Sequence, residues 1–366
     1  MVTERLMKAG QWDLKLSKST PKAIRDALDY WGHVYVFGAP MRDGQGDATM
    51  IAASRWGGIV RRRKTPFDVG GTNMIAWLGD EDGKGPIIEA AVTQTAASFA
   101  TWVAAIRPAA VGAGTISAVA GTLTNTYQWV TPRAALDNLA AYFNAEYRVN
   151  KDATLDAGAY GTSLFNWTPT AIAMRLSSGR DMNVVGIHTT ELAVSIDSEE
   201  YFDRVLVKDA SGTWTNAPGT ATPYKDLHGN ALAMTKAVTS SLTPTAAAAS
   251  LAANLVASGQ TLRQEVTLST DEFDISRDVK AGDSINVYDP QSNLVDTTNP
   301  VRFRGTTVYP IKLRVMAATW PIERGMGVWY RSKLGVWTDL TRFIEWESAG
   351  VSFEVGVSSR ALLTTP

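Results

Sequence analysis

The chain has 366 residues, which is long for a single hydrophobic core and indicates two or three domains. Its 35 lysines and arginines nearly balance 36 aspartates and glutamates, so no general electrostatic attraction to nucleic acid or anionic lipid is expected. The absence of cysteine excludes disulfides, thiolate nucleophiles and cysteine-based zinc sites.

The N-terminal residues MVTERLMKAGQWDLKL carry charges but no apolar core segment, so we expect no signal peptide. No apolar run approaches the roughly 18–20 residues that a membrane-crossing helix needs. We therefore expect a soluble protein, synthesised in a cytoplasm. A near-zero net charge protects poorly against self-association, which suits an assembly subunit better than a solitary enzyme.

Glycine and proline are spread along the whole chain, with short β-branched segments between them, as in a mostly-β protein with many turns. In residues 1–95, a short helix is expected over 22–30, after Thr20-Pro21. A threonine hydroxyl can satisfy a free N–H at a helix start, and proline is well tolerated at the first helical position. Strands are expected at four segments: 33–37, 48–53, 58–63 and 74–78.

The next part of the chain contains two helix-like segments. Residues 96–106 repeat apolar side chains at Phe99, Trp102, Val103 and Ile106 before Pro108. Residues 132–146 begin after Thr131 and gather one apolar face, formed by Leu136, Leu139, Ala140 and Phe143. Composition changes near residues 91–95 and 177–180 indicate domain boundaries on either side of this helical middle.

Strands are expected again at 184–188 and 204–207. Residues 208–242 include SGTWTNAPGTATPYKDLHGN, which reads as a long excursion, and long loops tend to be functional or ordered by a partner. An alanine-rich helix is expected over 244–258, after Thr243-Pro244, with Gly259 as its C-terminal cap.

Four further strands complete the predicted elements, at 265–268, 284–288, 312–316 and 351–357. The last has the clearest alternation, because Val351, Phe353, Val355 and Val357 alternate with smaller or polar residues. The resulting fold class is mainly β with an α+β middle.

Candidate metal ligands are few. His33, His188 and His228 are far apart and lack any metal-binding spacing, so structural or surface roles are favoured. The turn Asp80-Glu81-Asp82-Gly83 resembles the start of a calcium loop, but Lys84 stands where an oxygen ligand is needed. We interpret it as a hairpin turn between 74–78 and 86–89.

The sequence signals for catalytic residues are also weak. The adjacent pair Glu199-Glu200, near Asp203 and Arg204, could be offered as glycosidase carboxylates, but a solvated turn with a local ion pair is favoured. Gly282-Asp283-Ser284 lacks the surroundings of a serine nucleophile and is interpreted as a turn that leads into a strand. The sequence therefore predicts no enzyme activity, with no catalytic, metal or cofactor-binding residue.

Two clusters leave binding roles open. The basic run 61–64 (RRRK) could line a DNA groove, but a subunit contact or a strand edge protected by charge is favoured. Trp320, Trp329, Trp337 and Trp346 could form a sugar-binding platform, whereas their spacing also matches one aromatic per strand, so burial is favoured.

Several segments resemble a known family. They are WLGDEDGKGPIIE, RVNKDATLDAG after the TPRAALDNLAAYF helix, GRDMNVVGIHTTELAVSIDSEEYFDRVLV, VKAGDSINVYDP and YPIKLRVMAATWPIERGMGVWYR. Together the order of these segments is similar to the tail hub, or minor tail, proteins of siphophages, which themselves resemble the baseplate hub of T-even phages.

The resemblance implies a domain plan. Residues 1–95 would form a first β-barrel-like domain, 96–180 a mixed α/β middle domain, and 181–318 a second β-barrel-like domain with 208–261 as its excursion. Residues 319–366 would then be a C-terminal β extension.

The resemblance also implies a function. Three copies would form a ring in the virion that closes the distal end of the tail tube. They would contact the distal tail ring protein, the tape measure protein and the tail-tip or fibre proteins, while DNA passes transiently through the lumen. No cofactor and no stable membrane association are implied. The alternative is a carbohydrate-binding receptor module. The tryptophan content and the polar 208–230 segment favour this alternative.

Overall fold

The computed structural model describes residues 1–5, 7–41, 45–80, 83–160, 172–174, 191–197, 201–209, 211–220, 224–225, 227–239, 245–259, 263–270, 281–289, 295–298, 300–303, 306–322, 324–346 and 351–357. No helix within these ranges is long and apolar enough to span a membrane.

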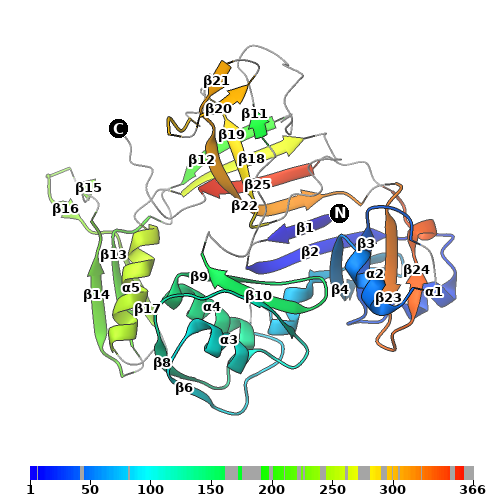
Figure 1. The fold of residues 1–366 in the computed structure, drawn as a ribbon, viewed down its shortest axis with the longest axis horizontal. Coiled ribbons are helices and arrows are strands. Elements are labelled where there is room, and N and C mark those ends of the chain that lie inside the picture. The colour runs from blue at the N-terminus through cyan, green and yellow to red at the C-terminus, as the bar shows by residue number, and fades with distance from the viewer. Residues whose placement is uncertain are drawn as a thin grey trace.

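One large sheet dominates the described residues (Figure 1). Its path runs β12-β18-β25-β22-β1-β2-β5-β4-β3-β23-β24, with β19 joined to β22 and β11 to β19. The strands are β1 (Val2–Arg5), β2 (Lys8–Lys15), β3 (His33–Phe37), β4 (Trp56–Arg63), β5 (Asp68–Asn73), β11 (Ile172–Met174), β12 (Glu191–Asp197), β18 (Arg263–Thr270), β19 (Ser284–Tyr288), β22 (Ile311–Trp320), β23 (Gly327–Arg331), β24 (Trp337–Asp339) and β25 (Val351–Val357). The sheet brings segments from both ends of the chain together, because β1 pairs with β22 and β3 pairs with β23.

The core beneath this sheet follows from strict alternation in β2 and the residue after it. Trp12, Leu14 and Leu16 are buried, whereas the residues between them are exposed, so one face of the strand is apolar. The Trp12 indole packs edge-on against Trp56 with 6.3 Å between ring centroids, and its Nε1 donates to the Ile59 carbonyl at 3.2 Å. Gly71 permits this close packing, since a Cβ there would lie 1.8 Å from the Ile59 carbonyl oxygen.

A second core joins three helices and small sheets, below and to the left of the large sheet in Figure 1. The helices are α3 (Phe99–Ile106), α4 (Pro132–Phe143) and α5 (Thr245–Gly259). The sheets are β6 (Val92–Ala97) with β8 (Leu123–Tyr127); β7 (Gly112–Ile116), β10 (Thr154–Ala159) and β9 (Ala145–Val149); and β14 (Trp214–Pro218), β13 (Arg204–Lys208) and β17 (Thr235–Thr239). The middle of the chain and the 208–261 excursion therefore share one apolar interior.

Smaller elements complete the description. They are α1 (Lys22–Ala27), α2 (Asp47–Ala53), the 3₁₀ helices η1 (Met74–Leu78) and η3 (Thr341–Phe343), and the short strands β15 (Tyr224–Lys225), β16 (Ala231–Leu232), β20 (Val301–Phe303) and β21 (Thr306–Val308). The predicted fold class, mainly β with an α+β middle, is confirmed. Strands were expected correctly at 33–37, 58–63, 204–207, 265–268, 284–288, 312–316 and 351–357.

The start of α4 and the end of α3 confirm their sequence signals, since α3 ends at Ile106 just before Pro108. Thr131 Oγ1 accepts a hydrogen bond from the Ala134 N–H at 3.1 Å. Thr20 does not cap α1, because its hydroxyl donates to the Ser17 carbonyl at 2.6 Å. Gly259 is the last residue of α5, and its lack of a side chain is required by Phe202, whose ring a Cβ would approach to 2.2 Å. Residues 243–244 lie outside the described ranges.

Two predicted segments were assigned wrongly. Residues 48–53 are helical in α2, and 74–78 form η1, because a short apolar run does not distinguish a strand from a helical turn. In the predicted excursion, the described residues include β14, which returns from β13 through a turn in which Asp209 Oδ1 accepts from the N–H groups of Ser211 and Thr213. The strand expected at 184–188 lies outside the described residues.

Candidate functional site

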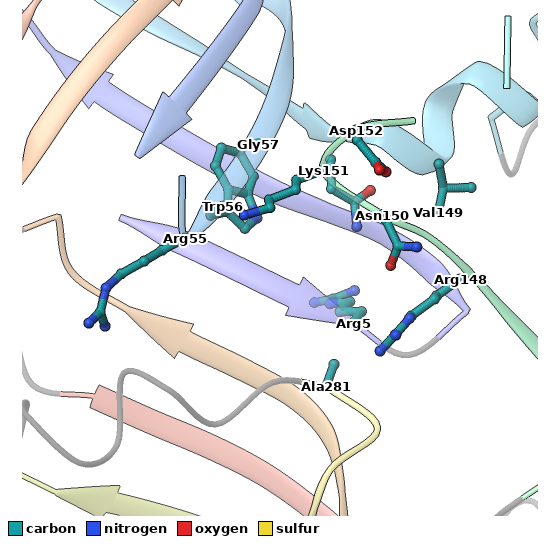
Figure 2. A pocket seen from close by; sticks show the side chains of 11 residues that line it. Arg5, Arg55, Trp56, Gly57, Arg148, Val149, Asn150, Lys151, Asp152 and Ala281 are labelled. Atoms are coloured by element: carbon teal, nitrogen blue, oxygen red, sulfur yellow. The ribbon is translucent and has the colours of Figure 1, made fainter. Parts of the chain in front are cut away.

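A cavity of about 300 Å³ lies where the N-terminal strands meet the β9–β10 turn (Figure 2). Its walls come from Arg5 at the end of β1, residues 55–57 at the start of β4, Asn73 at the end of β5, the 148–152 turn, and Ala281 ahead of β19. The cavity is therefore assembled by the tertiary fold from segments that are distant in sequence.

The β9–β10 turn has a fixed geometry. The Ala153 N–H donates to the Asn150 carbonyl at 2.9 Å, and the Asn150 N–H donates to the Thr154 carbonyl at 2.8 Å. Asp152 Oδ1 accepts from both the N–H and the hydroxyl of Thr154, at 3.1 and 2.7 Å. These bonds hold the charged residues of the turn at the rim of the cavity.

Lys151 fastens this turn to the N-terminal strands. Its Nζ donates to the Ala52 carbonyl at 2.9 Å and to the Ser54 carbonyl, both at the C-terminal end of α2. Carbonyls at a helix end lack partners within the helix and favour a cation. Gly57 leaves room for the lysine, since a Cβ there would lie 3.2 Å from Lys151 Cβ.

Arg148 is oriented by a buried carboxylate. Its Nε and Nη2 lie 3.0 and 2.9 Å from Asp156 Oδ2. Asp156 Oδ2 also accepts from the Asn150 side-chain amide at 2.9 Å, and its Oδ1 accepts from the Thr115 N–H at 2.7 Å. This set of bonds fixes the guanidinium group with part of its surface left to solvent.

Positive charge predominates around the cavity. Arg5, Arg55, Arg148 and Lys151 line it, whereas Asp152 is the single carboxylate in the same lining. Arg5 is exposed, and Arg55 packs over Gly38, where a Cβ would lie 2.2 Å from the guanidinium Nε. Because cations outnumber carboxylates in the lining, the cavity can attract an anionic group.

The three histidines do not form a site among the described residues. His33 lies on β3 beside Tyr35 and Trp77, with ring centroids 6.2 and 6.1 Å away. Burial, aided by the charge of Arg331, lowers the pKa of His33 to about 4. His228 lies in the exposed turn between β15 and β16, and His188 lies outside the described residues. Within those residues, no group of three potential metal ligands is present.

The acidic turn at residue 80 is not a hairpin, because 74–78 is a 3₁₀ helix and 86–89 is not a strand. Asp80 pairs with Arg61 at 2.7 Å, and its N–H donates to the Lys84 carbonyl at 2.6 Å. Glu81 and Asp82 lie outside the described residues.

The structure describes some of the residues that were considered as candidate catalytic groups. Glu199 and Glu200 lie outside the described residues, whereas Asp203 is buried and Arg204 Nε donates to Asn216 Oδ1 at 3.0 Å, not to a local carboxylate. Gly282 has φ +99° and Ser284 begins β19, which confirms the interpretation as a turn into a strand.

The basic run is used within the chain. Arg61 pairs with Asp80 and covers the Trp31 ring, with 4.3 Å from guanidinium carbon to ring centroid, and Arg62 pairs with Asp13 at 2.6 Å. Arg63 donates to the carbonyls of Arg25 and Leu28. β4 lies between β3 and β5, but β3 pairs with residues 56–59 only, so β5 is the strand that pairs with the basic run.

The tryptophan series is internal. Trp320 and Trp329 are buried, and Trp337 and Trp346 are partly buried against the same cores. Trp337 Nε1 donates to Asp47 Oδ1 at 2.7 Å. The four rings therefore do not form an exposed platform, which confirms the preference for burial.

Sequence reasoning did not identify the cavity. Its cations are residues 5, 55, 148 and 151, and only the last two are close together in the sequence. The only available signal was the charged turn in RVNKDATLDAG, where Asn150 and Asp152 mark a chain reversal.

The sequence matches no protein-family model and no curated protein. Its fold, however, is similar to those of solved structures. The tail protein from Neisseria meningitidis MC58 superposes with a TM-score of 0.52 at 14% identity, covering 97% of this chain and 90% of that one. The 43 kDa tail protein of prophage MuSo2 from Shewanella oneidensis gives 0.51 at 12% identity, with 98% and 92% covered. Prophage tail protein gp18 from Listeria monocytogenes EGD-e gives 0.52 at 9% identity, with 97% and 86% covered. The chain thus has the fold of phage tail proteins over nearly its whole length.

Proposed function

We propose that this chain is a structural subunit of a phage-type tail, located in the virion. The observation that carries the proposal is the similarity of fold to three tail proteins, which extends over at least 97% of this chain and at least 86% of each of them. The similarity concerns the fold, and the role in the particle is our inference from it.

More specifically, the chain is a hub at the distal end of the tail tube. Three copies form a closed ring that joins the distal tail ring protein to the tape measure protein and the tail-tip or fibre proteins, and DNA passes through its lumen. A closed ring needs two different complementary surfaces on each copy. Residues 1–95 and 181–318 are the two β-barrel-like domains in this proposal, 96–180 is the middle domain, and 319–366 is a C-terminal β extension. Its strands β23 and β24 lie beside β3, whereas β25 lies between β18 and β22.

Exposed apolar side chains support a role in an assembly. Leu227, Leu334 and Val336 are largely exposed at the tips of two turns, and Trp129 and Trp214 are exposed as well. Large apolar groups on a surface commonly mark contacts with other proteins. The subunit acts through such contacts, and the proposal assigns it no catalytic step.

Among the described residues, the carbohydrate-binding alternative is best served by the exposed Trp129 and Trp214, since the tryptophans at 320, 329, 337 and 346 are internal. Localisation of the chain in a particle distinguishes the two functions. Density for three copies around a central channel supports the hub. A peripheral position away from the tail axis, together with glycan binding by the purified chain, would contradict it.

A further inference from the structure

We propose that the basic cavity between β1, β4 and the β9–β10 turn binds the carboxylates of an acidic peptide segment from a neighbouring protein chain. That the neighbour is another tail protein rests on the proposed function. The chemistry of the cavity itself does not depend on it.

The cationic groups come from separate parts of the fold. In Figure 2, Arg5 and Lys151 lie between Arg148 on one side and Arg55 on the other, and the Arg55 side chain extends away from the other three. Its guanidinium group packs over Gly38. Together the four cations outnumber Asp152 in the lining and Asp156 behind Arg148. In a chain whose charge is -1 overall, this is a local concentration of positive potential.

Two of these groups are held in place before any ligand binds. Lys151 is fixed by two carbonyls at the end of α2, and Arg148 is fixed by Asp156. A binding site whose side chains are already ordered loses little conformational entropy when the partner arrives. Arg5 is exposed at the end of β1, where it can close over a bound group.

Carboxylates fit the available donors. A guanidinium group presents parallel N–H donors that match the two oxygens of a carboxylate, and three of the four cations here are arginines. A cavity of about 300 Å³ accommodates a few side chains. Aspartate or glutamate side chains on one peptide segment can therefore reach several cations at once.

The same features disfavour nucleic acid. Strands of DNA are bound by extended basic surfaces and, when single-stranded, by exposed aromatic rings on which bases stack. Trp56 is the aromatic residue in the lining, but it is only 3% exposed. The longest basic run, 61–64, is engaged with Asp80, Asp13 and backbone carbonyls through its three arginines.

Fluorescence anisotropy of a labelled hexaglutamate peptide with the full chain, at low ionic strength, tests the proposal. Arg5→Glu should weaken binding about tenfold, because it reverses one of four charges around the cavity. Lys18→Glu makes the same change in net charge at an exposed lysine outside the lining and should alter binding less than twofold. Arg5→Lys keeps the charge without the paired donors and should fall between wild type and Arg5→Glu.

The comparison probes are a labelled oligothymidylate and inorganic phosphate. We expect neither to bind as tightly as the peptide or to lose affinity selectively in Arg5→Glu. Absence of peptide binding, equal losses in Arg5→Glu and Lys18→Glu, or tighter Arg5-dependent binding of the oligothymidylate would each overturn the proposal. Because these measurements use the isolated chain, they remain informative if the chain proves to lie away from the tail axis.

Discussion

Arg314 in β22 and Glu146 in β9 form an ion pair with 2.6 Å between Nη2 and Oε2, and both side chains are almost completely buried. The pair joins the large sheet to the helical middle. Arg314 also donates from Nε to the Gly282 carbonyl at 3.2 Å and covers the Tyr160 ring at 4.9 Å. The contact thus connects residues from three distant parts of the sequence.

Removal of one member of this pair should be strongly destabilising. Glu146→Ala leaves the guanidinium group buried without its carboxylate, and we expect a loss of about 3–5 kcal/mol in the free energy of unfolding, measured by denaturant melts. The double variant Glu146→Leu, Arg314→Met removes both charges and should recover a large part of that loss. If the double variant is no more stable than Glu146→Ala, the buried charge is not the cause.

The apolar face of α4 supports a second prediction. Phe143 is buried against Phe99, with 5.4 Å between ring centroids, and Leu136 and Leu139 lie in the same core. Phe143→Ala should therefore lower the free energy of unfolding by about 3–5 kcal/mol, since it leaves a cavity beside α3. Ala141→Ser, at a partly buried position on the same helix, is the control and should cost less than about 1 kcal/mol. A loss below about 1 kcal/mol for Phe143→Ala would contradict the role of this ring.

Elements with a repeated pattern could be predicted from the sequence, and the cavity could not. The apolar spacing of α4 and its Thr131 cap depend on residues close together in the sequence, so both can be recognised without knowledge of the fold. The alternation of Trp12 and Leu14 with polar residues is an equally local signal for β2, but this strand was not predicted from the sequence. By contrast, Arg5 and Arg148 approach one cavity only through strand pairing and packing, whereas the conspicuous run 61–64 is largely engaged internally.

The partly buried His33 should make stability depend on pH. The folded pKa of His33 is about 4, below the ordinary value of 6.5, so the unfolded chain binds more protons between these two values. The stability that this neutral histidine contributes is fully present above pH 6.5 and is lost as pH falls toward 4. The loss is on the order of 3 kcal/mol.

Denaturant melts of the wild type and His33→Gln between pH 7.5 and 4.5 would isolate this contribution. Glutamine is polar and does not titrate in the range, so the wild type should lose more stability than the variant on acidification. Parallel curves for the two proteins would show that His33 is protonated as easily in the folded chain as in the unfolded one.

Trp129 occupies a backbone position that favours glycine. Its φ is +58°, its N–H donates to the Ile88 carbonyl at 2.8 Å, and the Ile88 N–H donates to the Val130 carbonyl at 2.9 Å. This is the arrangement of a β-bulge whose first residue is left-handed and is usually glycine. The indole is 69% exposed, so little packing within the chain compensates for the strained backbone.

Trp129→Gly should therefore stabilise the isolated chain by about 1 kcal/mol, because a residue without Cβ adopts the left-handed region at no steric cost. Trp129→Ala is the matched control: it removes the same indole but keeps the Cβ, so its free energy of unfolding should stay close to that of the wild type. Denaturant melts of the three proteins measure the difference. If the glycine variant is no more stable than the alanine variant, the Cβ at this position does not strain the left-handed backbone.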